Sequence, residues 1–276
     1  MKPKARATDF TEEDLPANRK EVFQSCFREH FSLLVKLAVL LFVSLLPALI
    51  LWMVRQLQIH AQIAALSNPD EEMKAAVFFR TNLLFGWSEV VAIVLFGIAL
   101  AGITAILKRV LWDLPVFFWD DFRKGIKSNG LSFALLFFVL ALLTYFLRLM
   151  NDSLLQYIAE GLLIFILCPV FFWLMLNSIY YDLSILQRFE NALLFTLKTS
   201  PVTLLLSFLT FAPVVAALQL IPLLLVAALV LAFYGLVLLL PLILVWMLYA
   251  NHVFDRYINR EYHPEIYRKG MRKEEN

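Results

Sequence analysis

The sequence predicts an all-α polytopic membrane protein, with six transmembrane helices and short amphipathic helices on the cytoplasmic side. Two observations lead to this fold class. Hydrophobic residues make up 61% of the 276 positions and charged residues only 17%, against roughly half and a quarter in soluble domains. The apolar residues also gather in runs of about 20, the length that an α-helix needs to cross the hydrocarbon core of a bilayer.

Six apolar runs make up the predicted transmembrane domain at 33–250. Their only charged residues are Lys36, Glu89 and Glu160. Residues 201–250 carry no charge at all, and a single helix of that length would reach about 75 Å, so we expect the chain to fold back within it. The predicted spans are 33–54, 83–107, 131–147, 154–180, 202–220 and 223–250.

Basic residues divide unequally between the two sides of these spans. With the N-terminus inside, the cytoplasmic segments hold nineteen Lys and Arg residues and the outer segments hold four. Because cytoplasmic loops carry the excess of Lys and Arg, we expect both termini to be cytoplasmic. The opening residues lack the order of a signal peptide, since Glu12 and Glu13 precede the first apolar run. We therefore expect span one to be retained as an anchor.

Two cytoplasmic tails flank the spans, an N-terminal tail at 1–32 and a basic C-terminal tail at 251–276. In the first, Asn18 followed by Glu21 is a capping-box pattern, which marks a helix start. The apolar residues after it recur at helical spacing: Phe23, Phe27, Phe31 and Leu34. This spacing predicts an amphipathic helix lying at the inner membrane interface.

The connection between spans two and three predicts a second amphipathic helix, over 116–128. Asp113 and Pro115 are typical of a helix start, and Asn129 with Gly130 of a stop. An apolar stripe of this helix either lies in the lipid interface, with basic residues meeting anionic headgroups, or docks a cytoplasmic protein. The stripe is Phe118, Phe122 and Ile126, and the polar residues beside it are Asp120, Asp121, Arg123, Lys124 and Lys127.

The adjacent acids Asp120 and Asp121 also raise the alternative of a metal site for phosphoryl transfer. Neighbouring residues on a helix point about 100° apart, and no further acid follows at helical spacing. We therefore interpret both acids as solvated helix surface.

Ionisable residues inside a membrane are candidates for function because burying their charge in lipid is unfavourable. Lys36 lies near the inner end of span one and can extend its amine to the interface. Glu89 and Glu160 lie deeper, at similar depths, and Arg148 ends span three. These three residues predict an intramembrane polar cluster, either a structural ion pair, which we favour, or the binding region of a transporter.

Catalytic and metal-binding motifs are absent from the sequence. It has no His-Glu-x-x-His, no Gly-x-Ser-x-Gly and no phosphate-binding glycine loop. The four His residues are scattered without ligand spacing, and Cys26 and Cys168 are too far apart in the predicted topology to form a disulfide. We expect no enzyme activity and no cofactor.

Several short motifs resemble the YesL-like family of bacterial integral membrane proteins, a domain of unknown function. The similar segments are Gly102-Ile103-Thr104-Ala105 before Lys108-Arg109, Asp113-Leu114-Pro115-Val116-Phe117, Phe122-Arg123-Lys124-Gly125-Ile126-Lys127-Ser128-Asn129, and Phe189-Glu190-Asn191-Ala192-Leu193-Leu194. The chain departs from the family in its long N-terminal tail and its long outer segment at 55–82. The resemblance implies a six-span protein of the bacterial inner membrane, often encoded near carbohydrate-uptake ABC systems, with no established catalytic residues.

Together these features predict a non-enzymatic integral inner-membrane protein that acts as an accessory or partner-binding protein. Its expected partners are membrane lipids and, by resemblance alone, a cytoplasmic or membrane component of a sugar ABC transport system; no nucleic acid is expected. The alternatives are a small-solute transporter that uses Glu89, Arg148 and Glu160, and a membrane-embedded enzyme.

Overall fold

The computed structural model describes residues 15–150, 154–219 and 223–272. Over these residues the chain is α-helical and contains no strand. Six of its helices are long and apolar enough to cross a membrane, as the six predicted spans require. The predicted all-α polytopic class is therefore confirmed, and the protein is a multi-pass membrane protein.

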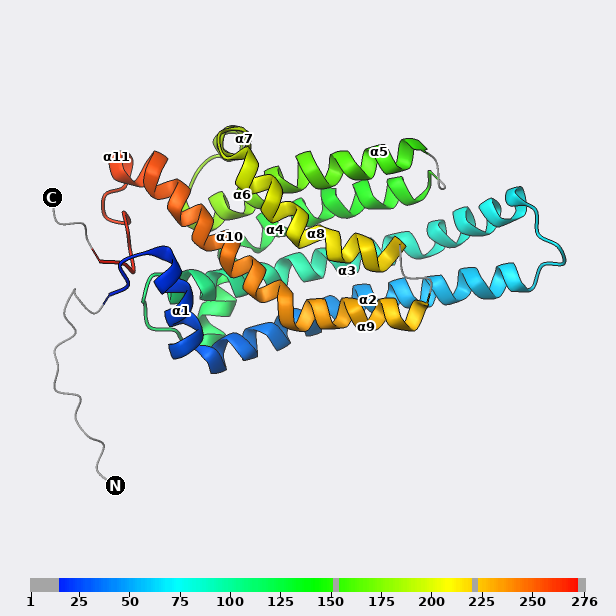
Figure 1. The fold of residues 1–276 in the computed structure, drawn as a ribbon, viewed down its shortest axis with the longest axis horizontal. Coiled ribbons are helices and arrows are strands. Elements are labelled where there is room, and N and C mark those ends of the chain that lie inside the picture. Colours follow the sequence, from blue (N-terminus) through cyan, green and yellow to red (C-terminus); the bar gives the residue numbers. More distant parts are fainter. Residues whose placement is uncertain (1–14, 151–153, 220–222, 273–276) are drawn as a thin grey trace, which may run out of the picture.

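The helices run back and forth along one long axis, and both described chain ends lie at the same end of the bundle (Figure 1). We call this end the inner end and the opposite one the outer end. The helical elements are α1 (Arg19–Glu29), α2 (Phe31–Ala64), α3 (Glu71–Leu111), α4 (Phe118–Arg148), α5 (Leu154–Leu162), η2 (Leu163–Leu167), α6 (Cys168–Tyr180), α7 (Ile185–Lys198), α8 (Ser200–Gln219), α9 (Leu224–Phe233), η3 (Tyr234–Leu238), α10 (Leu239–Phe254), η4 (Asp255–Asn259) and α11 (Arg260–Tyr262).

The first two long helices extend well beyond the predicted spans. With 34 and 41 residues, α2 and α3 are about 51 and 61 Å long, and their hairpin projects past the other turns at the outer end (Figure 1). Most of the expected outer segment at 55–82 is therefore helical and continues these two helices. The Asp70 side chain caps α3 by accepting a hydrogen bond from the Met73 amide at 2.7 Å.

Helix α4 is also continuous where the sequence predicts a break. Asn129 and Gly130 do not end a helix, since α4 runs without interruption from Phe118 to Arg148. Glycine in a helix interior costs only about 1 kcal/mol relative to alanine, and α4 packs along α3 on both sides of this position. The helix predicted over 116–128 begins two residues later than expected, at Phe118. Asp113 has a φ of 51°, in the left-handed region, and the helix begins after it.

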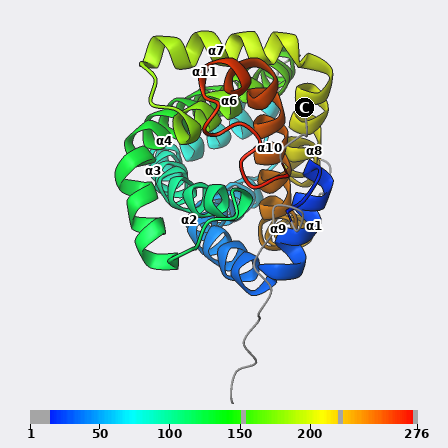
Figure 2. The same cartoon turned by 90° about the vertical axis from the view of Figure 1, so that its left-hand side faces the viewer.

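Helix α3 occupies the centre of the fold, and 56% of its most apolar window is buried within the protein. Helix α7 instead lies across the inner half of the bundle, since it is seen end-on in Figure 1 and lengthwise in Figure 2. A capping box between Ser184 and Gln187 begins α7. Its exposed apolar residues include Leu186, Phe189 and Leu197, as expected for a helix lying in the membrane interface.

Candidate functional site

A buried polar cluster joins the first three membrane-spanning helices towards their outer ends. The Glu89 carboxylate of α3 lies between two guanidinium groups, Arg55 of α2 and Arg148 of α4. Arg55 Nε is 2.7 Å from Glu89 Oε1, and the two side chains are only 6% and 7% exposed. Arg148, at 31% exposed, forms an ion pair with the other carboxylate oxygen. One carboxylate therefore serves two cations.

Asn82 completes this cluster by linking both arginines. Its side-chain oxygen accepts a hydrogen bond from Arg55 Nη1, and its amide nitrogen donates to the Arg148 backbone oxygen at 3.0 Å. The void that remains between these groups is about 10 Å³, enough for one water molecule at most. The arrangement binds three helices to one another and leaves no space for a solute.

The structure brings Glu89 and Arg148 together, as the sequence predicts, and adds Arg55 and Asn82 to them. Glu160 lies half-buried on α5, and its membership of the cluster stays a prediction. The sequence does not predict Arg55 and Asn82 as members of the cluster, because both fall just outside the apolar runs. Extending the helix of span one past Val54 would have placed Arg55 in the bundle.

The acidic pair on α4 divides into one buried and one exposed residue. Asp121 is 4% exposed, so its interpretation as solvated surface is wrong, whereas Asp120 is exposed. Asp121 Oδ2 accepts the Phe117 amide at 2.7 Å and lies 3.2 Å from Arg109 Nε of α3. This side chain therefore caps the start of α4 and ties it to α3.

The apolar stripe of the same helix packs against protein. Phe118 and Phe122 contact the main hydrophobic core, and a Cβ added to Gly102 would come within 2.4 Å of the Phe122 ring. Phe118, Phe122 and Ile126 are each half-buried, so part of the stripe packs against protein, and contact of the remainder with lipid or with a docked protein stays a prediction. The free surface of α4 at the inner end consists of Trp119, Asp120, Arg123, Lys124, Lys127 and Ser128.

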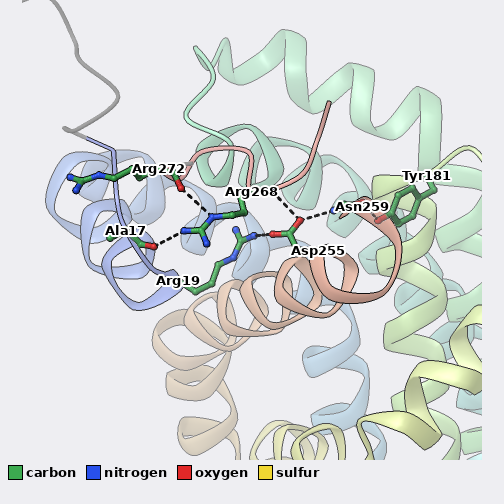
Figure 3. A network of polar contacts seen from close by, with 7 residues as sticks. All are labelled: Ala17, Arg19, Tyr181, Asp255, Asn259, Arg268 and Arg272. Carbon is green, nitrogen blue, oxygen red and sulfur yellow. Dashed lines mark hydrogen bonds and ion pairs between the residues drawn. The ribbon is translucent and has the colours of Figure 1, made fainter. Parts of the chain in front are cut away.

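A second polar network joins the first and last described segments of the chain at the inner end (Figure 3). Arg19 of α1 forms an ion pair with Asp255, which also accepts a hydrogen bond from Asn259 at 2.8 Å. Tyr181 in turn donates to Asn259 at 2.6 Å. Burial lowers the pKa of Arg19, although Asp255 opposes this shift, and burial raises the pKa of Tyr181.

The C-terminal segment continues this network up to the last described residue. The Arg272 amide donates to the Pro16 backbone oxygen at 2.9 Å, and Arg268 Nη2 donates to the Ala17 backbone oxygen at 3.0 Å. The segment predicted as a tail at 251–276 is thus folded onto the bundle as far as 272, where it meets the chain ahead of α1.

Metal-ligating and thiol side chains do not converge in the part of the chain that the structure describes. There, no three His, Cys, Asp or Glu side chains are placed to hold a metal ion. Cys26 and Cys168 are both buried free thiols, as the predicted topology required.

The bundle and its two polar networks define a multi-pass α-helical membrane protein whose buried charges hold helices and termini together. Comparison with protein-family models, with curated proteins and with solved structures finds no match for this chain.

Proposed function

We propose that this chain is a non-enzymatic accessory protein of the bacterial inner membrane, with both termini in the cytoplasm and its inner end presented to a partner. The asymmetry of nineteen basic residues against four supports this orientation. The resemblance to the YesL-like family is what suggests a component of a carbohydrate-uptake ABC system as that partner.

The free surface of α4 carries this proposal. Because Phe118 and Phe122 pack against the hydrophobic core, the exposed surface of α4 at its inner end is mainly polar. Its exposed residues combine Trp119, at 59% exposed, with both acidic and basic side chains. Aromatic residues and arginine are enriched in protein interfaces, and the exposed carboxylate of Asp120 would be repelled by an anionic membrane surface.

The inner end also has the rigidity that a docking platform needs. The ion pair between Arg19 and Asp255 fixes α1 against the last helix, and the Asp121–Arg109 pair fixes the start of α4. A surface held in one conformation before binding loses less conformational entropy when a partner docks.

Photo-cross-linking in cells tests the proposal. A photoreactive amino acid at Lys124 should yield a discrete protein adduct, whereas the same residue at Leu95, which is 56% exposed on α3, should yield lipid adducts only. Replacing Asp120 with Lys should weaken the protein adduct while the chain stays folded. Asp121 is unsuitable for this purpose because it is buried. Lipid adducts alone at both positions would refute docking at α4.

Transport of a small solute remains the alternative function, with Glu89 and Arg148 as its binding groups. A solute that contacts both groups requires the cluster to open, because the void between them, about 10 Å³, admits no solute. Loss of uptake in a Glu89→Gln variant of unchanged stability would favour transport over the accessory role. A membrane-embedded enzyme is the second alternative, and no converging side chains among the described residues speak for it.

A further inference from the structure

An apolar cavity of about 320 Å³ lies inside the helical bundle. Residues from all six spans line it, contributed by α2, α3, α4, α6, α8 and the last span from α9 to α10. An engineered protein cavity of about 150 Å³ admits benzene, so this one has room for a considerably longer hydrocarbon. Its position among the membrane spans places it within reach of lipid chains.

Water has little to bind in this cavity. The lining hydroxyl groups of Thr210 and Tyr234 are already engaged: Tyr234 donates to the Thr210 backbone oxygen at 2.6 Å, and Thr210 Oγ1 donates to the Leu206 backbone oxygen at 2.8 Å. Trp246 Nε1 donates to the same Thr210 hydroxyl at 3.1 Å. A buried water needs two to four polar partners, so the lining suits a hydrocarbon chain.

Among the described residues that line the cavity, one is charged: Arg148, at the end of α4. Its guanidinium pairs with the Glu89 carboxylate and remains 31% exposed. Arginine binds carboxylate and phosphate groups through its planar set of donors. An anionic headgroup at this end of the cavity would find hydrogen-bond donors in this guanidinium.

Helix irregularities adjoin the same cavity. The π-helical segment η3 begins at Tyr234, and η2 ends immediately before Cys168; both residues line the cavity. Single turns of π-helix are rare and occur frequently at functional sites. The two π-helical segments therefore support a binding role for this cavity, and this support does not depend on the charge of Arg148.

We propose that this cavity binds the alkyl chain of an amphiphile whose anionic headgroup pairs with Arg148. A free fatty acid and an anionic phospholipid with one chain inserted share this chemistry. The site is separate from the docking surface on α4, so either proposal can fail without the other.

Cys168 provides a direct test because it lines the cavity. In a Cys26→Ser background it is the only thiol, and its alkylation by N-ethylmaleimide can be followed by intact mass in nanodiscs of phosphatidylcholine. Oleate should slow this reaction about fivefold when present at about four times its dissociation constant. Phosphatidylglycerol in the nanodisc tests the phospholipid source, and methyl oleate tests whether the charge matters.

Four variants, one of them a control, separate binding of the alkyl chain from binding of the headgroup. Val214→Trp fills the cavity, so it should slow alkylation without oleate and remove any further effect; Val202→Trp, on the exposed side of the same helix, should behave as the wild type. Arg148→Gln should lose the protection by oleate, and Arg148→Lys should keep most of it. Protection by neither oleate nor phosphatidylglycerol, or equal protection by methyl oleate, would overturn the proposal.

Discussion

Arg55 Nε and Glu89 Oε1 lie 2.7 Å apart, in side chains that are only 6% and 7% exposed. Charges buried to this extent are tolerated in a membrane protein because each neutralises the other. The pair joins α2 to α3, and Arg148 extends it to α4. Three helices consequently depend on one carboxylate.

Replacing Glu89 with Gln should therefore destabilise the bundle by about 3 kcal/mol, since it leaves two arginines without their counter-charge. A second substitution, Arg55→Gln, should recover part of the loss. Unfolding in mixed detergent micelles measures both effects, and Glu72→Gln, exposed on the same helix, is the control. If the two losses simply add, the residues are not coupled.

Helix α4 approaches α3 so closely that Gly125 has no space for a side chain. A Cβ there would lie 2.5 Å from the Ala105 Cβ and 3.0 Å from the Gly102 Cα, neither of which can rotate away. Gly125→Ala should thus force the helices apart and lower stability by about 1–3 kcal/mol. The matched control is Gly161→Ala on α5, where nothing lies within 4 Å; it should be neutral or stabilising by up to about 1 kcal/mol.

Cys26 on α1 should react slowly with thiol reagents. Burial, together with Glu29, raises the pKa of its thiol from 9.0 to about 11, so near pH 8 its thiolate fraction is about a hundredfold below that of an ordinary cysteine. In a Cys168→Ser variant, the alkylation rate should rise about tenfold per pH unit and level off only near pH 11. A plateau near pH 9 would contradict this expectation.

The same shift makes stability depend on pH above about 9. Between pH 9 and 11 the folded state keeps the thiol proton that the unfolded state has lost, so stability falls as pH rises through this window and is unaffected below it. Cys26→Ser should remove this contribution. Thermal unfolding of the wild type and of Cys26→Ser as a function of pH measures this contribution. The titration of other groups at alkaline pH is the same in both proteins and cancels in the difference.

The pair formed by Arg19 and Asp255 joins α1 to η4 at the inner end. Asp255→Arg should release the C-terminal segment, which limited trypsin digestion would detect as faster cleavage after Arg260 or Arg268. The exchanged double variant, Arg19→Asp with Asp255→Arg, should slow cleavage again. Equal cleavage in the single and double variants would show that the ion pair does not fasten this segment.

Labelling of single cysteines tests the topology. In a chain lacking Cys26 and Cys168, a cysteine at the exposed position Ser67 should react with an impermeant maleimide in intact cells. A cysteine at Ser128 or Lys273 should react only after the membrane is permeabilised. Labelling at Lys273 in intact cells would refute the arrangement with both termini inside.

The sequence by itself determined the fold class, the six membrane spans and the two free thiols. Hydrophobic length and composition are enough for this, because a bilayer requires each apolar run of about 20 residues to form a helix. The sequence also predicted that Glu89 and Arg148 lie together, because charged residues inside a membrane pair with one another.

Tertiary structure alone decided the rest: that Arg55 joins Glu89, that Asp121 is buried, and that α4 runs unbroken through Gly130. The central cavity and the contact of the C-terminal segment with Pro16 also belong here. The physical reason is that a hydropathy pattern records whether a residue prefers lipid or water. The pattern does not record which helix packs against that residue. This depends on close packing between segments distant in sequence, where a single glycine or one shared carboxylate sets the geometry.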